Sequence, residues 1–301
     1  MLVGGASLTA TPQAFSLVHA LEAAELAVWC FDRATMPSVA VVADAVASYH
    51  FENCDALIAI GGAVAMDVAK GTALMTGQRN PFSALASDPG GEGVPMDVSA
   101  VPPLLVLPAT PAAAMSVGGA IWIADETGAA RPVRHPALRP SEAVLADDVI
   151  AGVPDGVCNR SSALAALVAA DAGCSDAAIG GLLEPSVPAG TMMRRGLDLA
   201  SAIEGARGPR RRLALTSSVI GGLDFGQMML TLVGEPRWLG EAQARLGDRP
   251  ADRTELGGDL VRSARSACGS DDLTEVDRVL EALGFELPGT PRRRGRRGRV
   301  G

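Results

Sequence analysis

The chain has 301 residues, of which 48% are apolar, and a formal net charge of −8 at pH 7. This much apolar material can form two hydrophobic cores and excludes a disordered chain. No apolar run approaches the roughly 18–20 residues that span a bilayer, and the first residues lack the basic segment of a secretory signal, so we expect no membrane partner.

Over the first 150 residues, short apolar strands alternate with alanine-rich helical segments. Helices are predicted at 11–24, 38–49 and 64–75, with Pro12 and Pro37 near the first two starts, where proline is tolerated. The predicted strands are 2–3, 26–31, 56–60, 104–107, 120–124 and 144–145. This alternation is typical of a parallel sheet with right-handed crossovers, and it predicts a Rossmann-like α/β domain.

From residue 159 onward the pattern changes to long helical segments rich in alanine, leucine and valine, with no convincing strand. These helices are predicted at 160–172, 190–206, 211–232, 238–247, 256–268 and 272–284. We therefore expect a dinucleotide-binding α/β domain at 1–151 and an all-α domain at 152–288.

The last residues, 289–301, are predicted to form a basic, disordered tail. Six arginines lie between Arg292 and Arg299, and without them the rest of the chain carries −14. Such an acidic body argues against a nucleic-acid partner. The tail has too few apolar residues to fold around, so we expect it to be solvated.

The five cysteines are scattered, odd in number and never spaced as Cys-x-x-Cys. This pattern argues against a disulfide framework and against a zinc–thiolate site. It favours a reducing compartment, so we predict a cytoplasmic protein.

Gly61 and Gly62 join a predicted buried strand directly to a predicted helix. Such a turn presents backbone N–H groups and the positive end of the helix dipole, and both suit a pyrophosphate. Glycine also lets the backbone approach a ligand closely. The turn therefore predicts a phosphate-binding cradle; glycines that serve packing alone are the alternative.

Lys70, on the same predicted helix, is the single lysine among 26 basic residues. The composition, rich in Ala, Gly, Arg and Pro, is typical of a genome that favours GC-rich codons. In such a genome lysine is replaced by arginine wherever the exchange has no effect on function. A lysine that persists there indicates a position where an ammonium cannot be replaced by a guanidinium. Alternatively, Asp67 and Lys70 lie three residues apart on one helix and pair, contributing a few tenths of a kcal/mol.

Residues 55–70 resemble the Gly-Gly-Gly-Ser-x-x-Asp-x-Ala-Lys signature of the iron-containing (group III) alcohol dehydrogenases, relatives of glycerol dehydrogenase and dehydroquinate synthase. The matching positions are Gly61, Gly62, Asp67, Ala69 and Lys70. Residues 103–110 resemble the family's strand ending in Pro-Thr-Thr. Residues 121–148 are similar to its later run of strand, turn and closing acidic turn. Together these segments cover roughly residues 1–150, in the family's order.

The resemblance implies a bound dinucleotide, NAD or NADP. The cofactor-binding residues that it implies are Gly61, Gly62, Ala63, Asp67, Lys70, Ala109 and Thr110. Ala63 and Val64 depart from the family, which has a third glycine and a serine there. Gly5 lies where the family often carries an acidic residue for the adenosine ribose, so the choice between NAD and NADP stays open.

Two departures from the family concern its chemistry. Its Gly-Thr-Gly-Ser-Glu loop near the nicotinamide falls on residues 112–116, where three alanines stand first. Its iron-binding Asp and His fall on Ser162 and Ala166, and no histidine follows His135. A chain without these ligands has too few groups to hold a first-row divalent metal, so we predict no metal site. We single out no catalytic residue.

These observations predict an NAD(P)-dependent, metal-independent oxidoreductase that acts on a small alcohol or carbonyl substrate. The alternative is a non-catalytic dehydrogenase homologue that serves as a nucleotide-binding or protein-interaction subunit. Arg194 and Arg195 are candidates for binding an anionic substrate, because guanidinium groups suit carboxylates. The resemblance also implies a homodimer.

Overall fold

The computed structural model describes residues 1–5, 10–35, 37–85, 94–125, 130–153, 158, 161–162, 165, 174–182 and 187–201. The predicted helices 211–232, 238–247, 256–268 and 272–284 and the predicted tail 289–301 lie outside the described residues, as does most of the predicted helix 160–172. The division into domains at residue 151 stays a prediction.

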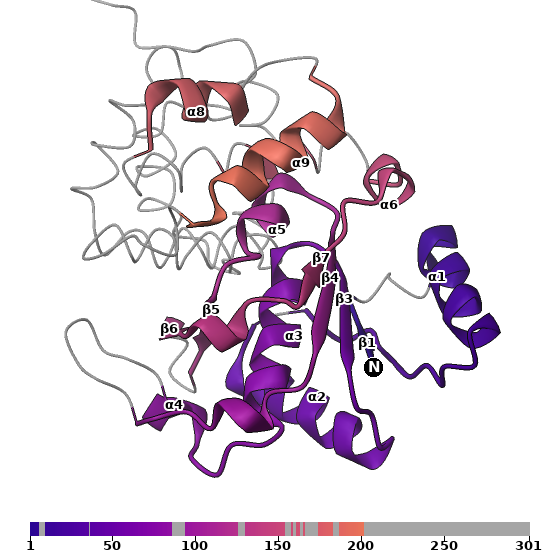
Figure 1. Ribbon diagram of the computed structural model, residues 1–301, viewed down its shortest axis with the longest axis vertical. Helices are drawn as coiled ribbons and strands as arrows, with labels where there is room; N and C mark the ends of the chain where they lie inside the picture. The colour runs from indigo at the N-terminus through magenta and orange to yellow at the C-terminus, as the bar shows by residue number, and fades with distance from the viewer. Residues whose placement is uncertain are drawn as a thin grey trace, which may run out of the picture.

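A five-stranded, fully parallel sheet with the order β2-β1-β3-β4-β7 forms the centre of the described part (Figure 1). The strands are β1 (Leu2–Val3), β2 (Cys30–Phe31), β3 (Leu57–Gly61), β4 (Leu104–Pro108) and β7 (Glu142–Ala143). The predicted parallel, Rossmann-like sheet is confirmed.

The strand order creates a switch point between β1 and β3. The chain leaves β1 toward β2 at one edge and then returns past β1 to build β3 on its other side. Open α/β sheets bind ligands at such a reversal, beyond the carboxyl ends of the strands. Gly4 and Gly5 follow β1 there, and Gly61 ends β3.

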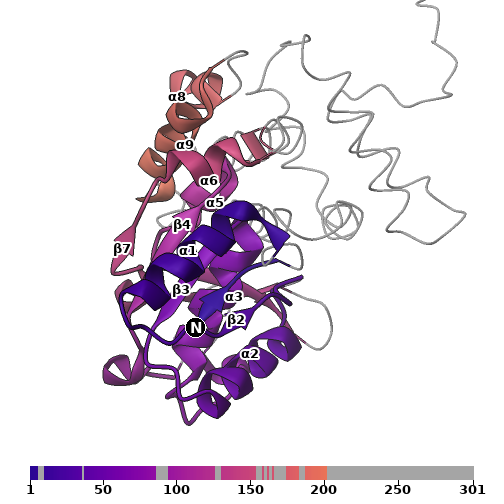
Figure 2. The ribbon, with the colours of Figure 1, turned by 90° about the vertical axis from the view of Figure 1, so that its right-hand side faces the viewer.

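Helices cover both faces of the sheet (Figures 1 and 2). The α-helices of this part are α1 (Pro12–Ala23), α2 (Val39–Phe51), α3 (Ala63–Met75), α4 (Phe82–Leu85), α5 (Pro111–Met115) and α6 (Asp147–Ala151), with 3-10 turns η2 (Val98–Ala100) and η3 (Pro136–Leu138). Thr11 and Ser38 cap α1 and α2, each accepting a backbone N–H through its side-chain oxygen. Such caps satisfy amides that lack a partner within the helix, so both predicted starts are confirmed.

Alternate residues of the central strands supply two cores. Leu57 and Val106 pack against α3 and α2 on one face. Ile60 and Leu107 pack on the other face against α1 and α6. This alternation follows from the two-residue period of a strand, and it places α3 directly against the centre of the sheet.

A separate antiparallel hairpin forms a third layer. β5 (Ala120–Ala124) pairs with β6 (Ala130–Arg134) rather than with the parallel sheet, so the inclusion of 120–124 in that sheet was wrong. The link of residues 125–129 is too short for a parallel crossover of about a dozen residues, so these two strands pair antiparallel. Ile121 and Ile123 pack with Val42 and Leu74 on the outer side of α2 and α3.

Two edge strands differ from their predicted bounds. The strand predicted at 26–31 is reduced to Cys30–Phe31 because Glu25 (φ 63°) ends α1 in a left-handed turn, in which the Leu26 N–H donates to the Leu21 carbonyl. This is a Schellman-type ending, which extends beyond the last helical residue. The strand predicted at 144–145 is β7 at Glu142–Ala143, where Leu105 pairs with Glu142.

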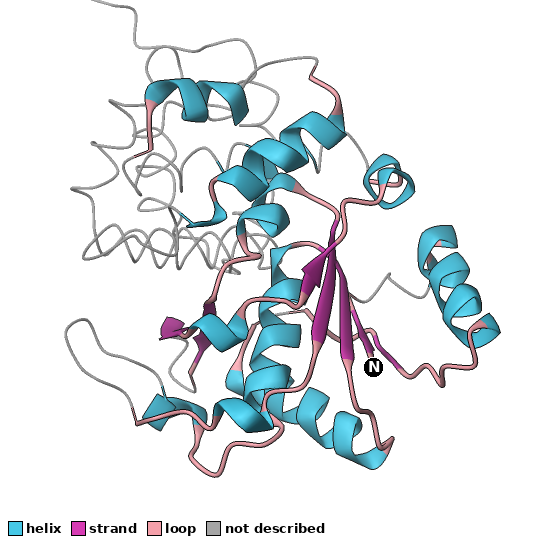
Figure 3. Ribbon diagram, in the orientation of Figure 1, coloured by secondary structure: helices cyan, strands magenta, loops and turns pink. Residues whose placement is uncertain are grey.

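Two further helices, α8 (Asp176–Leu182) and α9 (Ala189–Asp198), follow the sheet domain and lie beyond the carboxyl ends of its strands (Figure 3). α9 confirms the predicted helix at 190–206 in its first half, whereas α8 was not predicted. α9 packs against α5, α6 and α8. No helix in the described ranges is long and apolar enough to cross a membrane.

The contact between α9 and α5 is close enough to test by adding a single methyl group. A Cβ at Gly196 would lie 2.5 Å from the Pro111 carbonyl oxygen, whereas a Cβ at Gly190 would meet nothing nearer than 3.7 Å. We expect Gly196→Ala to lower the free energy of unfolding by about 1–3 kcal/mol through overpacking. Gly190→Ala in the same helix should leave it unchanged or slightly raised. Urea unfolding of both variants measures the difference; equal midpoints would contradict this packing.

Candidate functional site

The Gly61 turn lies at the switch point of the sheet. Gly61 ends β3 with φ 121°, in a region that is essentially restricted to glycine, and Gly62 is the N-cap of α3. A Cβ at Gly61 would meet no atom nearer than the Ala65 Cβ at 3.8 Å, so the conformation, rather than space, requires glycine. The strand therefore passes into the helix with no intervening loop.

The first turn of α3 carries the amides that the sequence predicts for phosphate. Gly62 is an extended N-cap without a side chain, and the Met66 N–H is the donor to its carbonyl. The N–H groups of Ala63, Val64 and Ala65 precede that bond, so they have no acceptor within the helix. They lie at the positive end of a 13-residue helix, which favours an anion.

The neighbouring loop after β4 is bonded to the Gly61 turn. The Ala109 N–H donates to the Gly61 carbonyl at 2.8 Å. Thr110 then caps α5, its hydroxyl accepting the Ala113 N–H at 3.4 Å. The structure thus brings Gly61, Ala109 and Thr110 together at the carboxyl ends of β3 and β4.

α5 was not predicted, although Thr110-Pro111 has the signature of a helix start, an N-cap threonine followed by proline. Its first amides bond to hydroxyl groups of the chain itself. Besides Thr110, Ser161 accepts the Ala112 N–H at 2.9 Å, and Ser161 is buried. Sequence reasoning missed Ser161, because a contact with a residue 49 positions away leaves no local signal. Two backbone N–H donors at this end of α5 are therefore already bonded within the protein.

Asp67 and Lys70 lie further along α3, and both side chains are fully buried. The Lys70 Nζ donates to the carbonyl oxygens of Ser116 and Ala120, at 2.7 and 2.6 Å. Lys70 is therefore directed at the segment that follows α5, and not at the first turn of α3. Its role as a cofactor ligand stays a prediction, as do those of the other implied residues.

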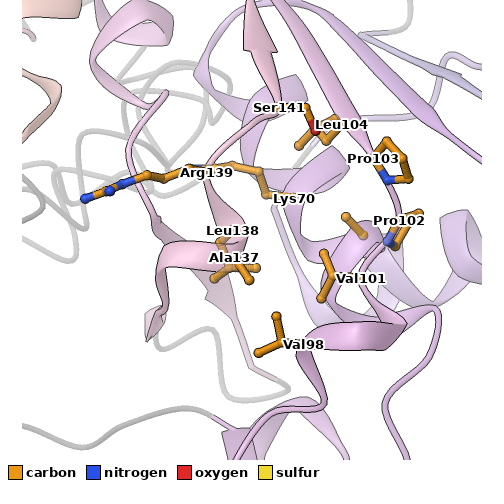
Figure 4. A pocket seen from close by; sticks show the side chains of 11 residues that line it. Lys70, Val98, Val101, Pro102, Pro103, Leu104, Ala137, Leu138, Arg139 and Ser141 are labelled. Atoms are coloured by element: carbon orange, nitrogen blue, oxygen red, sulfur yellow. The ribbon is translucent and has the colours of Figure 1, made fainter.

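A cavity of about 300 Å³ lies at the amino ends of β4 and β7, whereas Gly61 lies at the carboxyl end of β3. Figure 4 shows the side chains that line this cavity. Its walls come from the residues that enter β4, from the segment that enters β7, and from α3. The polar side chains that line it are Lys70, Arg139 and Ser141. Because ligands of open α/β sheets bind at the carboxyl ends of strands, this cavity is not the dinucleotide crevice.

Other titratable candidates have structural contacts. The His135 Nδ1 accepts the Ala137 N–H at 3.1 Å and so caps η3, which is a structural role. An Arg195 Nη donates to the Gly181 carbonyl and joins α9 to α8. Arg194 is exposed on α9.

Cys30 and Cys54 are free thiols. Burial, followed by the nearby Asp32 carboxylate, raises the pKa of the Cys30 thiol. A thiol with a raised pKa is protonated at neutral pH and makes a poor nucleophile. Cys30 is therefore no candidate for covalent catalysis.

A divalent metal does not fit the described residues. Among them, no group of three or more histidine, cysteine, aspartate or glutamate side chains lies together. Ser162, which stands where the family has an iron-binding aspartate, is buried, and a hydroxyl is a weak ligand for such metals. Ala166 lies outside the described residues.

A comparison with known families identifies the sheet domain. The model of the iron-containing alcohol dehydrogenases matches residues 1–147. This part of the chain belongs to the iron-containing alcohol dehydrogenase family. The resemblance read from the Gly61 segment is thereby confirmed.

Individual relatives agree with this family. A 4-hydroxybutyrate dehydrogenase from Cupriavidus necator is 31% identical over 159 residues, which are 52% of this chain and 40% of that protein. An iron-containing alcohol dehydrogenase from Thermococcus thioreducens has a similar structure, with a TM-score of 0.60 at 19% identity over 94% of this chain and 78% of that one. A sulfoacetaldehyde reductase from Bifidobacterium kashiwanohense, solved with NAD+, has a TM-score of 0.53 at 18% identity, covering 94% of this chain and 76% of that one. At these identities the structures establish the fold.

The conformation of Gly61 can be tested against that of Gly5. Gly61→Ala should lower the free energy of unfolding by about 1–3 kcal/mol, because an L-residue is strained at φ 121°. Gly5→Ala should be neutral, since its Cβ would meet only the Ala34 carbonyl at 4.0 Å without a positive φ. Thermal unfolding of both variants decides; an unchanged Gly61→Ala protein would contradict the turn geometry.

Proposed function

We propose that the protein binds a nicotinamide dinucleotide with its pyrophosphate at the first turn of α3. The observation that carries this proposal is the Gly61 turn at the switch point, with three helix amides that lack an acceptor within α3. Membership of residues 1–147 in a dehydrogenase family and a structural relative solved with NAD+ support it.

The adenosine half of the ligand would lie toward β1, and the nicotinamide half toward β4 and α5. β1 and β4 flank β3 in the sheet, so the ends of both strands border the Gly61 turn. Gly5 offers no carboxylate to hold the ribose of NAD or to repel the phosphate of NADP. We therefore propose that either dinucleotide binds.

The reaction that we propose is the interconversion of a small alcohol or hydroxy acid and its carbonyl compound. When bound, the dinucleotide supplies the hydride acceptor or donor. The chain's part is to orient the substrate carbon against the ring and to polarise its oxygen with backbone or arginine donors. The relative named 4-hydroxybutyrate dehydrogenase makes 4-hydroxybutyrate the first substrate to test.

The reaction is also proposed to need no metal ion. This part of the proposal rests on the sequence, in which no histidine follows His135 and a serine stands at position 162. If oxidation of 4-hydroxybutyrate proceeds at the same rate after dialysis against EDTA and after addition of Fe²⁺ or Zn²⁺, the proposal holds. A stoichiometric, tight site for either ion in a calorimetric titration would contradict it.

A second candidate function, a nucleotide-binding subunit without catalysis, is favoured by one observation. The residues Ala112–Ala114, which fall on the family's nicotinamide loop, are buried alanines, and the amides of Ala112 and Ala113 already bond to hydroxyl groups of Ser161 and Thr110. Tight NADH binding without turnover of any small aldehyde or hydroxy acid would favour this second function.

Substitution at Gly62 separates binding from stability. Its backbone, with φ −81° and ψ 180°, is that of an ordinary N-cap, so aspartate and asparagine both suit it. The carboxylate of Gly62→Asp should repel a pyrophosphate and weaken NADH or NADPH binding at least about tenfold, or ~1.4 kcal/mol. Gly62→Asn carries no charge and should bind more tightly than Gly62→Asp by most of that factor.

Calorimetry of both variants and the parent protein measures the affinities, with thermal unfolding as the control for stability. Both variants should unfold at or above the temperature of the parent, since both add a capping side chain. Equal affinities of the aspartate and asparagine variants would place the pyrophosphate elsewhere. The failure of the parent protein to bind either dinucleotide would contradict the proposed function.

A further inference from the structure

The buried ammonium of Lys70, on α3, binds two backbone carbonyl groups that lie far from α3 in the sequence. Lys70 is fully buried in the middle of α3, and its Nζ donates to the carbonyls of Ser116 and Ala120. Ser116 is the C-cap of α5, and Ala120 is the first residue of β5. One side chain therefore binds the first and the last carbonyl group of the segment 116–120.

The segment that Lys70 closes determines where α5 ends. α5 begins at Pro111, just beyond the hydrogen bond between Ala109 and Gly61, and it ends at Met115. A displacement of Ser116 therefore changes the position of a five-residue helix whose other end borders the Gly61 turn. The His135 N–H also donates to the Gly119 carbonyl at 2.9 Å, so the segment is held on both sides.

The chemistry of this contact requires an ammonium. Carbonyl groups that point inward must find donors, since an unsatisfied buried carbonyl costs about 1–3 kcal/mol. An ammonium is a compact charge with three donors, whereas a guanidinium is planar and larger. The positive charge also lies at the C-terminal end of α5, where the carbonyl dipoles favour it. These constraints account for a lysine that persists in a chain whose other basic residues are all arginine.

We propose that Lys70 is a positioning residue for the nicotinamide half of the site. It acts through Ser116 and Ala120, by holding α5 at the end of β4, beside the Gly61 turn. This inference rests on the proposed function. The pyrophosphate amides belong to the first turn of α3 and do not depend on this contact.

The proposal predicts a division between ligands. ADP occupies the β1 and α3 side of the crevice, whereas NADH extends over β4 to α5. Lys70→Met keeps the length and apolar stem of the side chain and removes the ammonium. We expect it to bind ADP within about twofold of the parent protein and NADH about tenfold more weakly.

The sequence also offers a test without a substitution, because a single lysine gives a single side-chain signal when the parent protein is labelled with ¹⁵N-lysine. Saturation with NADH should shift the Nζ resonance, because the ligand then contacts α5. Saturation with ADP should leave it in place. This measurement decides the matter even if Lys70→Met fails to fold.

The outcomes separate the two proposals. If the parent protein binds neither ADP nor NADH, the proposed function and this inference both fail. If it binds both and Lys70→Met weakens the two ligands equally, or neither, Lys70 is not a positioning residue and the proposed function stands. An Nζ resonance that ignores NADH in a protein that binds NADH overturns the inference in the same way.

Discussion

The turn at Gly61 is the constraint on which the arrangement at the carboxyl ends of the strands depends. Its φ of 121° lets β3 pass directly into α3, so the helix begins at the sheet edge and points its amides outward. From Ala63 to Leu74 every residue of α3 is buried. A shift of this turn would therefore displace the helix against which the sheet, α2 and the β5–β6 hairpin all pack.

The Gly61 turn and α3 bind the segment that follows β4 at two places. At the turn, the Gly61 carbonyl accepts the Ala109 N–H, and two turns further on Lys70 holds the carbonyls of Ser116 and Ala120. α5 lies between these two points, and α9 packs on it so closely that Gly196 has no room for a methyl group. Contacts at α5 thus couple the cradle to the helices that follow the sheet domain.

The elements defined by local patterns could be predicted from the sequence. Alternating strands and helices, the caps at Thr11 and Ser38 and the glycine turn all depend on residues close together in the chain. The Ser161 contact and the destination of the Lys70 ammonium could not, because they join residues that are far apart in the chain. The isolation of Lys70 in the composition did indicate an unusual position. α5 was within reach, since Thr110-Pro111 signals a helix start.

The central claim is that the dinucleotide pyrophosphate lies on the first turn of α3, and backbone amide NMR tests it most directly. Addition of ADP to the ¹⁵N-labelled protein should shift the resonances of Ala63 and Val64 most strongly, because their N–H groups receive the phosphate oxygens. Shifts confined to the cavity residues Val101, Leu138 and Arg139 at the amino ends of β4 and β7 would contradict the account.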